Sequence, residues 1–211
     1  MRKLFLASYF TETASMLPDF MKGDCTGKKV AFIPTAALHE EITFYVDTDR
    51  TALQNLGLIV EDLEISKASY EVIEKSLSDA DFIFVGGGNT FFLLQELKRT
   101  GTDQLIIRHI TKGKPYLSTS AGSCILSDNI IADGIESPDA APALNGDFSA
   151  LSIIDFYIYP HYGHDYSETS DKQILSQYYD KLNVKPISDK QAVTVDGETI
   201  AIITAENQGS K

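Results

Sequence analysis

The sequence predicts a single α/β domain built on a mostly parallel sheet with helices on both faces. Three observations lead to this fold class: apolar runs alternate with helical patterns, the connections between them are short, and no repeat, low-complexity segment or linker divides the 211 residues. The strand, helix, strand order implies right-handed crossovers and parallel pairing. We therefore treat residues 1–211 as one domain.

Apolar runs supply the strands of the predicted sheet. An almost continuous apolar run such as Lys-Val-Ala-Phe-Ile-Pro is typical of a parallel strand that is covered on both faces. Strands are expected at residues 3–10, 29–34, 58–65 and 80–85 and in the run that begins at Lys114.

Helical patterns separate these strands. The pattern at residues 40–55 is amphipathic and long, with Phe44, Val46 and Leu53 expected to face inward. Gly57 follows it, where a left-handed C-terminal cap is easily adopted. Further helices are expected at residues 13–22, 69–78 and 90–98, and another begins near Ser120.

The last part of the chain departs from this alternation. Residues 126–150 are rich in Asp, Ala, Gly and Pro and are long for a connection inside a compact domain, which indicates a functional loop. A strand is expected over 155–159 and a helix over 168–182. Residues 191–204 are two β-rich runs around Asp-Gly, the signature of a type I′ hairpin. The sheet should therefore end in a β-hairpin.

Composition excludes several classes of function. The net charge of −12 argues against nucleic acid or an anionic membrane as partner, because both are bound through clustered Lys and Arg. No apolar stretch is long enough to span a bilayer, and the short apolar run after the basic start fails as a signal peptide, so a cytoplasmic location is expected. Two cysteines and four scattered histidines suggest neither a disulfide framework nor a metal site, and no cofactor is expected.

The stretch Tyr-Leu-Ser-Thr-Ser-Ala-Gly, which ends at Gly122, places Ser120 where a strand turns into a helix. A serine at such a turn projects its hydroxyl from the end of a sheet, where a base can reach it and free helix N–H groups can stabilise an oxyanion. The alternative is a simple helix N-cap. We interpret Ser120 as a nucleophile, provided that its neighbours supply the rest of the chemistry.

Three glycines at residues 86–88 follow the predicted strand at 80–85. Phe91 stands where a dinucleotide fingerprint requires Gly, and no Lys-Ser/Thr follows as in a P-loop, so both nucleotide interpretations are weak. The glycines permit a close approach of the backbone to a substrate. Because ligands of parallel sheets bind at the carboxyl ends of the strands, this turn and the Ser120 turn should converge there.

A serine nucleophile needs a base, and His161 is the best placed histidine because Pro160 ends a strand just before it. His164 is the reserve, and His109 has the spacing of a helix surface position. A carboxylate should then orient the imidazole. Sequence spacing alone does not choose among the acids of the intervening loop, which are Asp128, Asp133, Glu136, Asp139 and Asp147.

These residues resemble a known family, the serine peptidases of the dipeptidase E and cyanophycinase group, whose fold is similar to class I glutamine amidotransferases and thus flavodoxin-like. The resemblance is carried by Gly-Gly-Gly-Asn-Thr-Phe-Phe-Leu-Leu at residues 86–94, by Ser-Ala-Gly at 120–122 and by Pro-His at 160–161. It extends over residues 3–204 in order.

The resemblance implies roles for particular residues. Ser120 would be the nucleophile and His161 the base, and an acid about twenty positions earlier falls on Asp139, with Glu136 as the alternative. The N–H groups of Gly88 and Ala121 would form the oxyanion hole, and Asn89 would line the substrate site. Aspartate-specific members carry an arginine where this chain has Ser170, so strict selectivity for N-terminal aspartate is not expected. Lys172 is the alternative source of a cation.

We therefore expect a serine peptidase of the dipeptidase type, a monomer or homodimer, that cleaves dipeptides or short peptides through an acyl-enzyme without a metal or cofactor. A glutamine-amidotransferase-like amidase is a rival, but those enzymes place Cys where this chain has Ser120. A catalytically silent small-molecule-binding or regulatory protein on the same scaffold is the third possibility. Cys124, one helical turn beyond Ser120, is assigned to the core.

Overall fold

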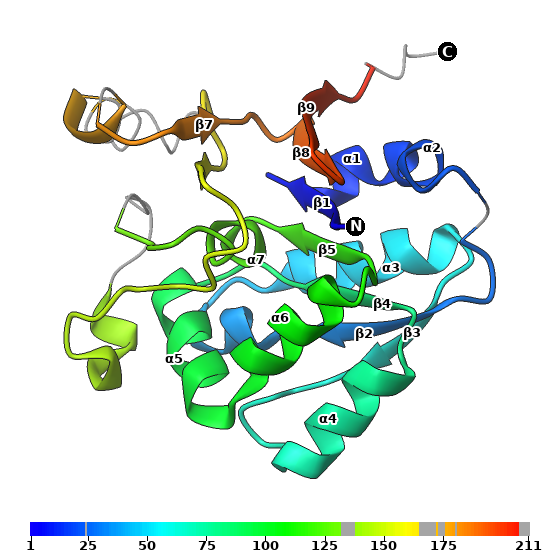
Figure 1. The fold of residues 1–211 in the computed structure, drawn as a ribbon, viewed down its shortest axis with the longest axis horizontal. Coiled ribbons are helices and arrows are strands. Elements are labelled where there is room, and N and C mark those ends of the chain that lie inside the picture. Colours follow the sequence, from blue (N-terminus) through cyan, green and yellow to red (C-terminus); the bar gives the residue numbers. More distant parts are fainter. Residues whose placement is uncertain (24, 132–137, 165–171, 173–175, 180, 207–211) are drawn as a thin grey trace.

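The computed structural model describes residues 1–211 except 24, 132–137, 165–171, 173–175, 180 and 207–211. Its centre is a seven-stranded sheet of order β3-β2-β4-β5-β1-β8-β9 (Figure 1). The first five strands in this order run parallel to one another, whereas β8 and β9 form an antiparallel hairpin. The predicted α/β class and the C-terminal hairpin are confirmed. The strands are β1 Lys3–Ala7, β2 Lys29–Ile33, β3 Ile59–Asp62, β4 Phe82–Val85, β5 Tyr116–Thr119, β8 Gln191–Asp196 and β9 Thr199–Thr204.

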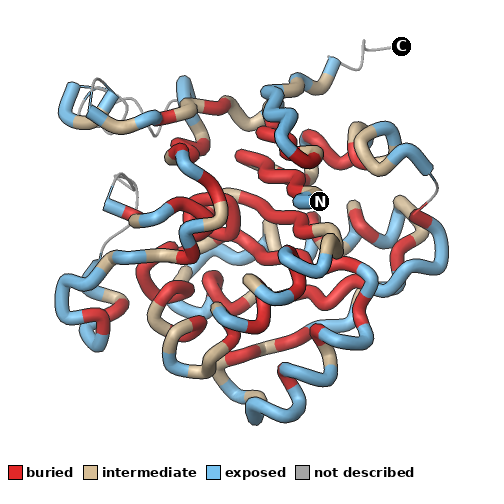
Figure 2. The backbone as a smooth tube through the Cα atoms, viewed as in Figure 1, coloured by how far each residue is buried: buried red, intermediate tan, exposed pale blue. Residues whose placement is uncertain are grey.

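Helices cover both faces of this sheet because the central strands are apolar on both sides. In β4, Phe82 and Phe84 belong to one buried cluster, whereas Ile83 and Val85 belong to the other. The central strands are accordingly buried throughout (Figure 2). The face of Phe84 is covered by α1 Phe10–Thr13, α2 Leu17–Met21 and α3 Phe44–Asn55, and the face of Val85 by α4 Tyr70–Asp79, α5 Thr90–Thr100 and α6 Thr102–Thr111.

Sequence signals set the ends of several helices. Ser69 caps α4 by accepting a hydrogen bond from the N–H of Val72, and Asn89 caps α5 by accepting one from the N–H of Phe92. Gly101 ends α5 in the left-handed conformation, with φ of 72°. The helix predicted at residues 40–55 begins only at Phe44, after the 3-10 helix η2 Thr35–His39, and its expected inward-facing Phe44 is 64% exposed.

The segment after α7 Ala121–Cys124 is irregular, as its composition predicts. It contains two short 3-10 helices, η3 Pro138–Ala140 and η4 Pro142–Leu144. The strand expected at residues 155–159 is β6 Tyr157–Tyr159, which pairs with β7 Val184–Pro186 in a separate parallel sheet and does not extend the main one. Much of the helix expected over 168–182 falls outside the described residues.

The sheet order brings four chain segments to one edge. The carboxyl ends of β1, β4 and β5 meet there, because these strands are parallel and β5 lies between the other two. Strand β8 is antiparallel to β1, so its amino end reaches the same place: Ala7 is opposite Ala192. Residues just before β8 therefore join residues just after β1, β4 and β5.

Candidate active site

Ser120 occupies the turn between β5 and α7 with φ of 46° and ψ of −113°, a backbone conformation that residues other than glycine rarely adopt. Such strain costs on the order of 1–3 kcal/mol and persists only where surrounding contacts impose it. Here the Ser120 N–H donates to the carbonyl of Ala7 at 3.0 Å, and the Ser120 carbonyl accepts from the N–H of Ser123 at 2.7 Å. Neighbouring strand and helix thus hold the serine in the strained turn.

Glycine is required around this turn by close backbone contacts. A Cβ at Gly122 would lie 2.2 Å from the Val85 carbonyl oxygen, and one at Gly88, where φ is 127°, would lie 2.4 Å from the carbonyl of Ala36. A Cβ at Gly87 would meet the Ser120 Cβ at 3.3 Å. The glycine turn after β4 therefore packs directly against the serine turn, as the convergence of the two turns predicts.

His161 lies between Ser120 and an aspartate. Its Nε2 is 3.0 Å from the Ser120 Oγ, and its Nδ1 is 2.6 Å from Oδ1 of Asp189. A neutral imidazole that carries its proton on Nδ1 donates to the carboxylate and leaves Nε2 to accept the hydroxyl proton of Ser120. The structure thus brings the two predicted residues, Ser120 and His161, within hydrogen-bonding distance.

The acid in this arrangement is Asp189, which corrects the expectation of Asp139. Asp139 lies in η3, which packs against α5, and Glu136 lies outside the described residues. The physical reason is the orientation of β8. Because this strand is antiparallel to β1, the residues that precede Gln191 arrive at the carboxyl edge of the sheet, where His161 is also found.

Ser8, at the end of β1, connects all three segments and was not singled out from the sequence. Its hydroxyl donates to Oδ1 of Asp189 at 3.2 Å and accepts from the N–H of His161 at 2.7 Å. Its carbonyl accepts from the N–H of Ser120 at 3.2 Å. The Ser8 side chain is fully buried, whereas those of His161 and Asp189 are partly exposed.

The environment of Asp189 favours its ionised form. Burial by itself would raise the pKa of this carboxyl, but hydrogen bonds from His161 and Ser8 and the nearby His164 outweigh it and hold the pKa below its usual value. The His164 Nε2 lies 3.9 Å from the second carboxylate oxygen. The reserve histidine therefore sits beside the acid, whereas His161 contacts the serine.

Two backbone N–H groups face no backbone acceptor at this edge. Within the described part of the chain, those of Gly88 and Ala121 donate to no backbone carbonyl. Both residues flank Ser120, one from the glycine turn and one as the first residue of α7. The side chain of Asn89, expected to line the substrate, caps α5 and is 5% exposed. Ser170 lies outside the described residues.

A cavity of about 290 Å³ opens beside this hydrogen-bonded row. It is small for a ligand pocket, which suits a short substrate. Ser120, His161 and Asp189 line it together with the glycine turn. Across the described residues, no group of three or more His, Cys, Asp or Glu side chains is arranged to hold a metal ion. The other lining residues are Tyr9, Glu40, Phe44, Tyr45, Asp49, Gly87, Gly88, Thr119 and His164.

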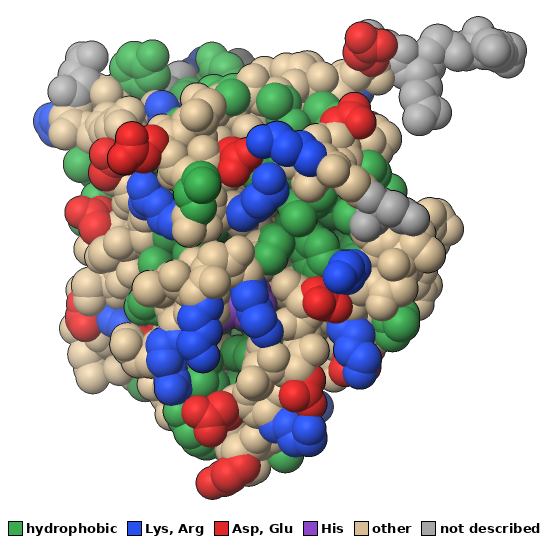
Figure 3. All heavy atoms as spheres, turned by 45° about the vertical axis from the view of Figure 1, so that its right-hand side comes forward, with side chains coloured by type: hydrophobic (Ala, Val, Ile, Leu, Met, Phe, Trp, Pro, Cys, Tyr) green, Lys and Arg blue, Asp and Glu red, His purple; other side chains and the backbone are tan. Residues whose placement is uncertain are grey.

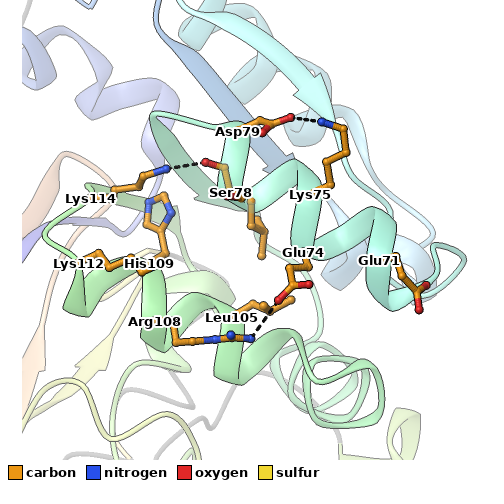
Figure 4. Close-up of a pocket in the computed structure, with 11 residues that line it drawn as sticks. Glu71, Glu74, Lys75, Ser78, Asp79, Leu105, Arg108, His109, Lys112 and Lys114 are labelled. Atoms are coloured by element: carbon orange, nitrogen blue, oxygen red, sulfur yellow. Dashed lines mark hydrogen bonds and ion pairs between the residues drawn. The ribbon is translucent and has the colours of Figure 1, made fainter.

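A second cleft, of about 400 Å³, lies between α4 and α6 (Figure 4). Several of its charged side chains bind one another or the backbone: Lys75 contacts Asp79, Arg108 contacts Glu74, and Lys114 donates to the carbonyl of Ser78 at 2.8 Å. Lysine and arginine also gather on the face shown in Figure 3, although the chain is acidic overall. This cleft contains basic side chains but no serine paired with a base.

His109, expected on a helix surface, is 5% exposed and lines this cleft. Its Nε2 bonds the carbonyl of Pro115 at 3.0 Å. Burial lowers the pKa of His109 to about 4, so the imidazole is neutral at neutral pH.

Cys124 is buried and its Sγ contacts the Ile158 carbonyl at 3.5 Å, in agreement with its assignment to the core. None of the described helices is long and apolar enough to cross a bilayer.

Comparison with known proteins agrees with this architecture. An uncharacterized peptidase of Pasteurella multocida is 43% identical over 99% of this chain and its own full length. A peptidase E of Actinobacillus pleuropneumoniae is 32% identical over 74% of this chain and 62% of its own. A solved structure from Listeria monocytogenes, provisionally named a peptidase E, superposes with a TM-score of 0.93 and is 40% identical, covering 98% of this chain and all of its own.

The profile described as peptidase family S51 matches residues 4–203, which span β1 to β9 and include every residue of the Ser120 cavity. The resemblance to the dipeptidase E and cyanophycinase group is thereby confirmed. The chain belongs to the serine peptidase family S51.

Proposed function

We propose that this protein is an exopeptidase of the dipeptidase type, which hydrolyses dipeptides or short peptides through an acyl-enzyme on Ser120. The observation that carries the proposal is the continuous row of hydrogen bonds from Ser120 through His161 to Asp189. Family membership implies peptide substrates, and relatives at about 32% identity are named peptidase E. The small volume of the cavity supports a short peptide.

The proposed reaction uses only groups at this edge of the sheet. Ser120 Oγ attacks the scissile carbonyl carbon while Nε2 of His161 takes the hydroxyl proton, and Asp189 stabilises the resulting imidazolium. The oxyanion is bound by the N–H groups of Gly88 and Ala121. His161 then gives its proton to the leaving amine as the C–N bond breaks. Water, deprotonated by the same imidazole, hydrolyses the ester and restores the serine.

Strict selectivity for N-terminal aspartate is not part of the proposal. A carboxylate in a pocket needs a fixed cation, and guanidinium is favoured because it binds carboxylate in a bidentate fork. No Lys or Arg is found among the described residues that line the cavity. We therefore expect wild-type enzyme to show only a weak preference for Asp-X dipeptides over dipeptides with other small or polar N-terminal residues. Profiling a dipeptide panel measures this preference.

Labelling with a fluorophosphonate, followed by peptide mapping, tests the nucleophile directly. We expect the label on Ser120 and expect Ser120→Ala to abolish it, with kcat lowered by about 10⁶-fold because the triad acts as a unit. Ser123→Ala is the matched control, since Ser123 lies in the same turn and its hydroxyl instead bonds the Ala7 carbonyl at 2.8 Å. Peptidase activity that survives in Ser120→Ala would refute the mechanism.

Thiol alkylation separates the proposal from an amidase with a cysteine nucleophile. Cys124 is buried, and its thiol points to the Ile158 carbonyl. Thiol alkylation should therefore leave the activity unchanged. Inactivation by iodoacetamide with the modification mapped to Cys124 would favour the amidase.

A further inference from the structure

Two carboxyl groups outside the triad line the Ser120 cavity. Glu40 and Asp49 line the cavity, and no lysine or arginine is found among its described lining residues. Glu40 is partly exposed, whereas Asp49 is only 1% exposed. A negative charge held in a small cavity beside a nucleophile attracts positively charged groups of a substrate.

Asp49 is held by a hydroxyl and not by a cation. The Oγ1 of Thr11 donates to its Oδ1 at 2.8 Å, and the Thr11 backbone also bonds the carboxyl. No ion pair of Asp49 occurs within the described residues. A buried carboxylate without an opposite charge is costly, and a bound cation would relieve that cost. Burial correspondingly raises the pKa of Asp49 to about 7.

The substrate of an exopeptidase supplies a cation close to the scissile bond. In a dipeptide, only the N–Cα and Cα–C bonds separate the terminal ammonium from the carbonyl that Ser120 would attack, a span of about 2.5 Å. The ammonium must therefore lie within the same small cavity. Among its described lining residues, Asp49 is the carboxyl that is both buried and outside the triad.

We infer that Asp49 binds the α-ammonium group of the substrate and so restricts the enzyme to peptides with a free N-terminus. This inference rests on the proposed function, because it assigns the ammonium to a peptide whose carbonyl faces Ser120. The aromatic side chains of Tyr9, Phe44 and Tyr45, which line the same cavity, would contact the first side chain. Phe44 is 64% exposed and is thus available to a ligand.

Binding measurements test the inference without requiring turnover. Leucinamide carries the ammonium and an amide carbonyl, and N-acetyl-leucinamide carries an uncharged and bulkier acetamido group in place of the ammonium. By calorimetric titration we expect wild-type protein to bind leucinamide at least about tenfold more tightly than N-acetyl-leucinamide, the size of one charge-assisted hydrogen bond. Asp49→Asn should weaken leucinamide binding by about the same factor and leave N-acetyl-leucinamide unaffected. Equal binding of the two amides by wild type would overturn the inference.

Thr11→Val is the matched control for a purely structural role of Asp49. It removes the hydroxyl hydrogen bond and keeps the carboxylate, so leucinamide binding should be retained. If Thr11→Val loses as much binding as Asp49→Asn, Asp49 acts only by holding α1, and the inference is wrong. Fluorophosphonate labelling of Ser120 needs no ammonium, so its rate should be unchanged in Asp49→Asn. Labelling that fails in wild type would refute the proposed mechanism, whereas the amide titration judges the role of Asp49 separately.

Discussion

The cavity beside Ser120 lies at the carboxyl ends of the parallel strands, whereas the second cleft lies between α4 and α6, which cover one face of the sheet. Residues that follow β4 and β5 line the cavity, and residues that precede these strands line the cleft. In the cleft, Lys75, Arg108 and Lys114 are neutralised or bound to backbone carbonyls. At the cavity, Ser120 and His161 both have positive φ, which is strained for these residue types. The cleft holds helices together, whereas the cavity keeps reactive groups in place.

Among changes that leave Ser120 and His161 in place, the removal of the acid of the cavity, Asp189, should lower kcat the most. We expect Asp189→Asn to lower kcat by roughly 10⁴-fold, because the amide no longer holds His161 in the tautomer that accepts the serine proton. Asp139→Asn is the matched variant from the loop that the sequence favoured, and it should retain near wild-type kcat. Steady-state kinetics on a dipeptide decide between them, and the reverse order would return the acid to Asp139.

Removing Ser8 should have a smaller and different effect. Ser8→Ala deletes the hydrogen bonds to Asp189 and to the N–H of His161, so we expect kcat to fall by about 10- to 100-fold through misplacement of the triad. Since the Ser8 hydroxyl lowers the pKa of Asp189, the acidic limb of the kcat/KM profile should move to higher pH.

Ser118→Ala is the control for Ser8→Ala. Ser118 is equally buried, on neighbouring β5, but its hydroxyl bonds that of Ser123 at 2.8 Å and contacts no member of the triad. We expect it to leave the pH profile unchanged. A Ser8→Ala enzyme with reduced stability and an unmoved profile would make Ser8 a packing residue.

The two regions should also respond to pH with opposite signs. The pKa of His109 is lowered by burial to about 4, so below about pH 6.5 the unfolded chain binds a proton that the folded chain excludes, and stability falls on acidification. The pKa of Asp49 is raised by burial to about 7, so the folded chain keeps a proton that the unfolded chain releases, and stability falls as pH rises toward 7.

The shift corresponds to about 3 kcal/mol for His109 and about 4 kcal/mol for Asp49, and single variants separate the two contributions. Between about pH 4.5 and pH 7, His109 makes the free energy of unfolding rise with pH, and His109→Gln should lack this rise. Asp49 makes the free energy of unfolding fall with pH, and Asp49→Asn should lack this fall. Urea unfolding across this range measures both slopes. If the free energy of unfolding depends on pH with the same slope in both variants, one of these two groups is not buried in its neutral form.

The sequence predicted the parts of the molecule that local patterns determine. Ser120 and His161 each follow a recognisable strand, and the glycine turn after β4 carries its own signature, so the convergence of the Ser120 turn and the glycine turn follows from parallel strand order. His161 follows β6, which lies outside the main sheet, so strand order alone does not bring it to Ser120. Asp189 follows from no local pattern. Its position depends on β8 pairing antiparallel with β1, a contact between the two ends of the chain. The only available signal was an aspartate directly before the predicted hairpin.

Ser8 and Phe44 show the same limit in other ways. A serine at the end of a strand is common, and Ser8 is distinguished only by its hydrogen bonds with His161 and Asp189, which depend on the folded structure. Phe44 fits the inward-facing pattern of a helix, yet it is the first residue of α3, lines the cavity and is 64% exposed. Periodicity reports which face of a helix is apolar, but not whether its first turn is covered.

The pairing of β8 with β1 also sets the order in which the enzyme would become competent during synthesis. Ser120 and His161 leave the ribosome before Asp189 and the strand that completes the sheet beside β1. A nascent chain that ends before residue 189 thus carries a nucleophile and a base without the group that orients them. Fluorophosphonate labelling of ribosome-bound chains of increasing length should begin only once β8 has emerged, and early labelling would contradict this order. Hydrolysis would thus depend on β8, which is synthesised after every other described strand except β9, so the nucleophile would stay inactive until the sheet is nearly complete.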